Sequence, residues 1–197
     1  MKATIEHPYA KLYDVAEGQG GFFTSKQAVD AGFVSNHHSY HVKAGNWTRE
    51  AWGIFRLAQF PMPERADLIR YSLWSRNRQD QPQGVYSHQT ALGLYDLSDV
   101  MPSKLHLSVP KTFRKNCAIP SALVLHYADL LPDDIEVREG YRVTRPLRTL
   151  LDLIDSKELS PDLMEQAIKE SRKRGLITVS EFKKHHAKLQ GYLKKPL

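Results

Sequence analysis

The side chains best suited to chemistry lie between Ser35 and Arg49, where hydrogen-bonding and basic residues follow one another. No Asp or Glu occurs from Ala31 to Arg49. An Asn side chain can pair with an adenine edge through two hydrogen bonds, and Ser, His, Lys and Arg bond bases or phosphates. We therefore expect this stretch to contact DNA. The candidate DNA-binding residues are Ser35, Asn36, His37, His38, His41, Lys43 and Arg49.

The histidines of this stretch raise the alternative of a metal site. His37 and His41 are four residues apart and would share one face of a helix. No Glu follows His37, as a metalloprotease helix requires, and no third ligand is evident. The single cysteine, Cys117, excludes an intramolecular disulfide and a multi-cysteine zinc site. The sequence thus predicts no metal and no cofactor.

No pattern typical of an enzyme occurs. A Gly-rich phosphate loop and a Gly-x-Ser-x-Gly elbow are both absent. Asp162, Glu181 and Lys183 resemble the acidic pair and lysine of a metal-dependent nuclease. An enzyme of this kind is the alternative to a DNA-binding regulator. Such a site needs a strand, whereas Asp162 and Glu181 each lie in the first turn of a predicted helix, where the helix dipole favours an acid. We therefore expect no catalytic residues.

Short elements punctuated by glycine must position the DNA-contact residues. Thr24 or Ser25 is expected to cap a helix that ends at Gly32. Ser35 is expected to cap a second helix over 36–44, which Gly45 stops. The apolar contacts between the two helices are assigned to Ala28, Val29, Phe33, Tyr40 and Val42.

A hairpin and an earlier helix complete the predicted N-terminal domain. The strands are expected at 47–49 and 54–57, and the earlier helix at 12–17. Two helices joined by a glycine turn and followed by two strands predict a winged helix-turn-helix over residues 1–62. The alternative is that the same pattern serves as a protein-interaction module.

A larger domain is predicted over residues 63–197, after a linker at Pro61–Pro63. Its helices are expected at 64–76, 88–95, 146–155, 161–174 and from 179 onward. Its strands are expected at 104–109, at 122–127 and as a pair within 135–143. Leu105, Leu107 and Val109 alternate, which indicates a half-buried strand. The fold class is therefore α+β: an N-terminal winged helix-turn-helix followed by helices around a small sheet.

The charge balance favours an anionic partner. The chain has 197 residues and a formal net charge of +6. Residues 1–62 hold six Lys and Arg against five Asp and Glu, so most of the excess lies beyond the predicted DNA-binding domain. Residues 1–11 show no signal-peptide pattern, and no apolar run is long enough to span a bilayer. We expect a cytoplasmic protein without a membrane partner.

Three segments resemble the AbiEi family, the antitoxins of type IV toxin–antitoxin systems known from phage abortive infection. They are YSHQTALGLYDL at 86–97, LHLSVP at 105–110 and VTRPLRTLLDL at 143–153. With the winged helix before them, the resemblance covers nearly the whole chain. It implies a transcriptional autorepressor that binds inverted repeats of double-stranded DNA in its own promoter.

The same resemblance implies an antitoxin that counteracts a nucleotidyltransferase toxin without a stable complex. Five cations are assigned to the antitoxic surface: Arg145, Arg148, Arg172, Lys173 and Arg174. The alternative for Arg148 is a structural pairing with Asp152 one helical turn later. We expect a monomer that pairs on DNA. The alternative function is a stand-alone winged-helix transcriptional regulator.

Overall fold

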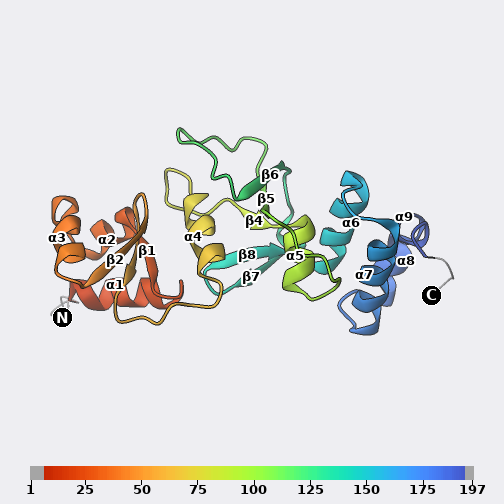
Figure 1. Cartoon of the computed structure of the whole chain (residues 1–197), viewed down its shortest axis with the longest axis horizontal. Helices are drawn as coiled ribbons and strands as arrows, with labels where there is room; N and C mark the ends of the chain where they lie inside the picture. Colours follow the sequence, from red (N-terminus) through yellow and green to blue (C-terminus); the bar gives the residue numbers. More distant parts are fainter. Residues whose placement is uncertain (1–6, 194–197) are drawn as a thin grey trace, which may run out of the picture. The chain divides into compact units, whose positions relative to one another are not determined.

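The computed structural model describes residues 7–193 and has an α+β fold (Figure 1). Residues 1–6 lie outside the described part, and with them falls part of the stretch 1–11 in which no signal peptide is expected. The chain divides into two compact units. The first runs to Gly84 and includes Arg138–Tyr141, and the second comprises Val85–Val137 and Arg142 onward.

The first unit alternates short helices with the strands of a small antiparallel sheet. Strand β3 lies in the centre, between β1 and β2. The elements are α1 (Pro8–Glu17), β1 (Phe22–Thr24), α2 (Ser25–Ala31), the 3₁₀ turn η1 (Ser35–His37), α3 (His38–Lys43), β2 (Trp47–Ala51), β3 (Ile54–Leu57) and α4 (Ala66–Trp74).

The boundaries of α2 follow from local chemistry. The Thr24 hydroxyl accepts a hydrogen bond from the Gln27 N–H, and the Gln27 side chain accepts one from the Thr24 N–H, which makes a capping box. Gly32 ends the helix with a φ of 108°, a left-handed conformation that glycine adopts without steric cost. The predicted cap and end of this helix are confirmed.

Two apolar clusters hold the first unit together. One gathers side chains of α1, α2, β1, β2 and β3, with Phe23, Phe33, Trp47 and Phe55 as its aromatic members. In the other, Ile69 and Leu73 of α4 pack against Phe22 and Ile54. Helix α4 thus belongs to the first unit, although the sequence places the linker before it, at Pro61–Pro63.

Several expected details of this unit are wrong. Val29 and Tyr40 are 46% and 65% exposed, so neither joins the core. The second helix opens with η1, and Ser35 does not cap it, because the N-cap position is Val34 and no side chain bonds there. Strand β1 was not predicted. Its three residues become a strand only by pairing with β3.

The second unit contains a five-stranded sheet with the order β6-β5-β4-β8-β7. Strand β4 pairs antiparallel with β5 and parallel with β8, while β5 and β6 are parallel. The strands are β4 (Val85–Tyr86), β5 (Leu105–Val109), β6 (Leu123–Tyr127), β7 (Ile135–Arg138) and β8 (Tyr141–Thr144), with the 3₁₀ turn η2 (Pro132–Asp134) before β7.

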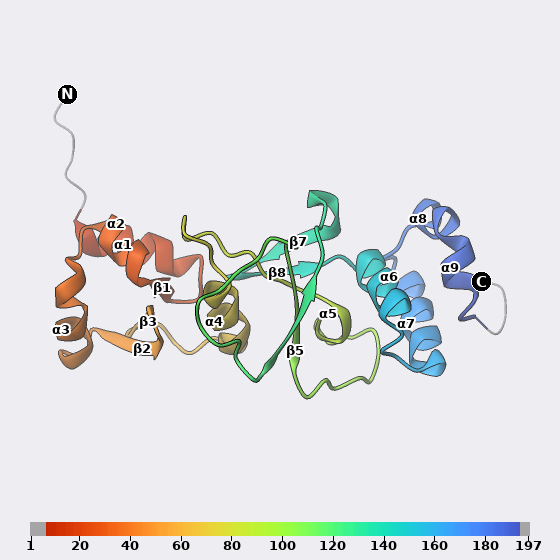
Figure 2. The same cartoon turned by 90° about the horizontal axis from the view of Figure 1, so that it is seen from above.

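Five helices complete the second unit. They are α5 (His88–Leu94), α6 (Pro146–Ser156), α7 (Pro161–Lys173), α8 (Val179–Lys184) and α9 (His186–Gln190). Helices α6 and α7 lie side by side in both views (Figures 1 and 2). Asp162 and Glu181 lie in the first turns of α7 and α8, as predicted, and Glu181 forms a capping box with Thr178.

Strand β5 is buried on both faces, which corrects the expectation of a half-buried strand. Leu107 and Val109 are buried on one side, and His106 and Ser108 are buried on the other. Helix α5 packs against β5. Within residues 7–193, no helix combines the length and apolar character needed to cross a bilayer.

Candidate nucleic-acid interface

One surface of η1 and α3 exposes a set of polar side chains, which we call the η1–α3 face. It has no acidic member, and it consists of Ser35, Asn36, His37, Ser39 and Lys43, all exposed. Tyr40 projects from the same two turns. The face therefore offers hydroxyl, amide, imidazole and ammonium groups to a partner. Four of the seven predicted contact residues belong to it.

His38, a predicted contact residue, is buried instead, with 6% exposure. Its ring lies against Trp47 and Phe55, at centroid distances of 5.3 and 5.8 Å. Burial is the main cause that lowers the pKa of His38. The correction has a geometric reason, since the 3₁₀ turn of η1 sets the rotation at which α3 begins. His38 therefore lines the inner side of the surface.

His41 is half-buried and also faces inward. Its ring stacks on Trp47 with centroids 4.5 Å apart and planes 23° apart. Its Nδ1 lies 3.2 Å from the Tyr9 hydroxyl. Burial lowers the pKa of His41, with a smaller contribution from the nearby His37. These contacts give His41, which the sequence predicts as a DNA-contact residue, a part in the packing of α3.

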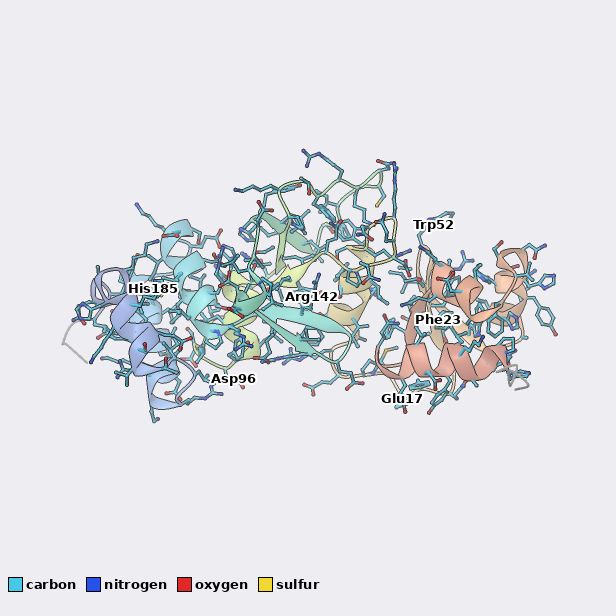
Figure 3. All side chains as sticks on the ribbon, turned by 180° about the vertical axis from the view of Figure 1, so that it is seen from behind. Glu17, Phe23, Trp52, Asp96, Arg142 and His185 are labelled. Atoms are coloured by element: carbon cyan, nitrogen blue, oxygen red, sulfur yellow. The ribbon has the colours of Figure 1, made fainter. Side chains whose placement is uncertain are left out.

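The β2–β3 hairpin places an arginine and a tryptophan beside the η1–α3 face. Arg49 is exposed on β2, and its guanidinium lies 5.5 Å from the Phe55 ring centroid. Trp52, in the turn, is 90% exposed and points away from the ribbon (Figure 3). Gly53 follows with a φ of 65°, which the tight turn requires. Sequence reasoning missed Trp52, although its position before a turn glycine was a signal.

Contacts within the first unit brace the hairpin turn. The Arg76 guanidinium donates to the Gly53 carbonyl at 3.3 Å, and its Nε forms an ion pair with Asp80 at 2.9 Å. Asp80 also accepts a hydrogen bond from the Thr24 hydroxyl. The Ser25 N–H donates to the Gly53 carbonyl at 2.9 Å. The start of α2 and the hairpin turn are thus held in one network.

A groove of about 260 Å³ runs between η1–α3 and the hairpin. No carboxylate lines it. Its residues are Ser25, Ser35, His38, Ser39, Arg49, Trp52, Gly53 and Phe55. Glu50, the acid of β2, is held in an ion pair with Arg56 at 2.9 Å. The groove therefore presents hydroxyl donors, a guanidinium and an indole, which suits an anionic or aromatic ligand.

Two of the cations predicted for the antitoxic surface take part in contacts near the start of α6. Arg148 bonds Asp152 at 2.9 Å and Asp134 at 3.2 Å, so the structural alternative for this residue is correct. Arg145 donates to the Ile135 carbonyl at 3.3 Å and is exposed.

The other three predicted cations lie at the end of α7. The Arg172 guanidinium lies 4.5 Å from the Phe182 ring centroid. Arg174 donates to the Tyr95 carbonyl at 2.6 Å. Lys173 is exposed, and its ammonium nitrogen lies 3.6 Å from a carboxylate oxygen of Glu170. Each of these three cationic groups therefore has a contact within the second unit.

Comparisons with known proteins give no family. No family model matches the sequence, and no curated protein matches it either. Among solved structures, the chain is similar to the RV2827C protein from Mycobacterium tuberculosis. The two share 11% sequence identity, the match covers 100% of this chain and 85% of the other, and the TM-score is 0.48.

Proposed function

We propose that the first unit is a winged-helix domain that binds double-stranded DNA and makes the protein a transcriptional regulator. The observation that carries the proposal is the acid-free groove between η1–α3 and the β2–β3 hairpin, with Arg49 and Trp52 on its rim. We propose the cytoplasm as its compartment.

The η1–α3 face supplies the groups that read base edges. A helix in the major groove contacts bases with residues near its start, and Asn36 and Ser39 are exposed there. Amide and hydroxyl groups match the donor and acceptor pattern of that groove. Because His38 and His41 pack inward, we assign base reading to Asn36, His37 and Ser39, with Lys43 on a phosphate.

The hairpin supplies sequence-independent contacts. Arg49 carries a fixed positive charge suited to a phosphate or a minor groove. Trp52 offers an exposed indole that can lie against a sugar or a base step. Because the Arg76 and Asp80 network braces the turn, these groups are held near their binding positions before DNA arrives.

The test is fluorescence anisotropy of the full chain with labelled DNA from upstream of its own gene, over a salt series and with scrambled DNA as competitor. We expect preference for the native sequence that survives physiological salt, together with a fall of affinity as salt rises. Equal, weak binding to both DNAs would reject sequence-specific regulation and leave the first unit as an interaction module.

We further propose that the chain is the antitoxin partner of a nucleotidyltransferase toxin. The proposal rests on the AbiEi resemblance, and one structural relationship supports it. The three resembling segments are neighbours in space, since β4 pairs with both β5 and β8, and α5 packs on α6. Coexpression with a nucleotidyltransferase encoded beside the gene should restore growth. Continued growth arrest despite soluble protein would reject this role.

A further inference from the structure

Three metal-ligating side chains of the second unit converge on one point. They are His106 on β5, His126 on β6 and Glu158 in the loop after α6, and one ligand atom of each lies within 4.8 Å of the others. His106 Nδ1 is 2.9 Å from His126 Nε2 and 3.6 Å from Glu158 Oε2. The three residues come from separate elements, so the convergence is a product of the fold.

The sheet fixes the two imidazoles relative to each other. Strands β5 and β6 are parallel, with His126 opposite Ser108, and His106 lies two residues before Ser108 on the same face. The backbone N–H of His106 donates a hydrogen bond to the Thr90 hydroxyl at 2.7 Å, which ties the strand to α5. Both rings therefore start from rigid backbone positions, as a ligand pair requires.

Glu158 is held at the edge of the cluster. It follows Lys157, which ends α6 with a φ of 55°. Its carbonyl accepts a hydrogen bond from the Gln89 side chain at 3.4 Å. Its own side chain is 33% exposed, which leaves a path by which an ion can enter from solvent.

A buried layer supports the His126 imidazole. The His88 ring stacks on His126, with centroids 3.6 Å apart and planes 11° apart. His88 Nδ1 is 2.9 Å from the Ser87 hydroxyl oxygen, which accepts a hydrogen bond from Ser108 at 2.7 Å. The stacked His88 ring therefore restricts the orientation of His126, and the hydrogen bonds hold His88 in place.

The cluster brings together three atoms of the kinds that transition metals bind, two imidazole nitrogens and a carboxylate oxygen. The two imidazole nitrogens are within hydrogen-bonding distance, so a proton on one ring satisfies the pair in the absence of a metal, and a metal ion would take the place of that proton. Burial is the largest cause that lowers the pKa of His106 and of His126, although Glu158 opposes it. A neutral imidazole, with a lone pair on one ring nitrogen, is the form that binds a metal.

We propose that His106, His126 and Glu158 bind a divalent transition-metal ion of the zinc class. Two ligands bound to a tetrahedral zinc ion are about 3.3 Å apart. The observed separations of 2.9 and 3.6 Å lie on either side of that value. Imidazole nitrogens favour zinc, cobalt or nickel over magnesium and calcium, which prefer oxygen ligands. Three protein ligands leave a fourth position for water or an exogenous ligand.

The experiment is a calorimetric titration of the full chain with Zn²⁺ after treatment with a chelator, with Mg²⁺ as the comparison ion. We expect one Zn²⁺ per chain and no comparable binding of Mg²⁺. Co²⁺ should give the visible absorption of a tetrahedral site. Mutating a residue that only supports a metal ligand lowers metal affinity about 10–100-fold. Removal of a ligand itself should cost at least as much, so Glu158→Gln and His126→Ala should each weaken Zn²⁺ binding at least about tenfold.

Matched variants separate this site from other histidines and from misfolding. Glu139→Gln alters another exposed carboxylate, and His37→Ala alters an exposed histidine of the first unit; both should bind Zn²⁺ as the unmodified chain does. Because Glu158 is exposed, its Gln variant should keep the near-UV circular dichroism of the parent. Absence of saturable Zn²⁺ binding, unchanged affinity in the folded Glu158→Gln variant, or loss of binding in His37→Ala would each overturn the proposal.

Discussion

The imidazole of His41 stacks on the indole of Trp47, with ring centroids 4.5 Å apart. This contact joins α3 to β2, and therefore the η1–α3 face to the strand that carries Arg49. His41 follows the exposed Tyr40, yet its ring also packs edge-on against Phe33, with centroids 5.1 Å apart. The stack thus positions the proposed DNA-reading surface without being part of it.

His41→Ala should destabilise the first unit. The variant loses the ring stack and its contact with the Tyr9 hydroxyl, and we expect a loss of about 1–3 kcal/mol in the free energy of unfolding. All three tryptophans lie in the first unit, so urea unfolding followed by tryptophan fluorescence reports on this unit. His37→Ala is the control, since His37 is exposed. Equal stability of the two variants would show that the stack contributes little.

Thr24→Val should loosen both α2 and the hairpin turn. The change keeps the shape of the side chain but removes the hydroxyl that caps α2 and bonds Asp80. Loss of the cap alone costs about 0.5–2 kcal/mol. The exposed Thr48→Val on β2 is the matched control, with an expected change within about 0.5 kcal/mol. Hydrogen exchange at the amides of 25–31 should accelerate in Thr24→Val alone, and unchanged exchange there would contradict the assigned capping role.

The elements that could be predicted from sequence are those with local signals. Helix α2 has a capping box at one end and a left-handed glycine at the other, so Thr24, Gln27 and Gly32 define it without distant contacts. The direction in which His38 and His41 point depends on two features that the sequence pattern did not reveal, the 3₁₀ turn before α3 and the position of Trp47. The 3₁₀ turn before α3 sets the rotation of the helix, and Trp47, further along the chain, receives both rings.

The histidine cluster of the second unit was missed for a related reason. His106 and Ser108 alternate with Leu107 and Val109, a pattern that usually indicates a solvent-exposed polar face. Helix α5 packs on this strand, and a polar side chain so covered must find partners inside the protein. Those partners include His126 on a neighbouring strand, which periodicity along one strand cannot reveal.

Asp152→Asn should change how the stability of the second unit depends on pH. Burial raises the pKa of Asp152 to about 6, against an opposing effect of Arg148. The folded state therefore holds the proton more tightly than the unfolded state, and Asp152 lowers stability as pH rises from about 4 to about 6. Relative to the parent chain, the Asn variant should gain up to about 3 kcal/mol across that range.

Urea unfolding followed by far-UV circular dichroism, at several values between about pH 4 and pH 7, measures this difference for the whole chain. Asp14→Asn, an exposed substitution on α1, is the control. The buried Oδ2 of Asp152 has no hydrogen-bond partner among the described residues, so the amide replaces no bond at that atom. A stability difference between Asp152→Asn and the parent that stays constant with pH would reject the raised pKa.

Asn36→Ala should reduce sequence discrimination more than overall DNA affinity. If Asn36 reads a base in the major groove, its loss weakens the specific site by about 1–3 kcal/mol and leaves scrambled DNA nearly unchanged. Competition anisotropy with both DNAs measures the two affinities. Asn46→Ala, an exposed amide substitution just after α3, should retain discrimination. Equal losses on both DNAs would mean that Asn36 contacts the backbone and that another residue reads the base.

Arg49→Ala should show the opposite pattern. A phosphate contact is independent of sequence, so both DNAs should lose affinity alike, and the slope of log affinity against log salt should fall by about one. Arg65→Ala is the matched control, because Arg65 is an exposed arginine of the first unit outside the groove. If Arg49→Ala spared the salt slope but Arg65→Ala reduced it, the DNA would lie away from the hairpin. The groove between η1–α3 and the hairpin would then not be the binding surface.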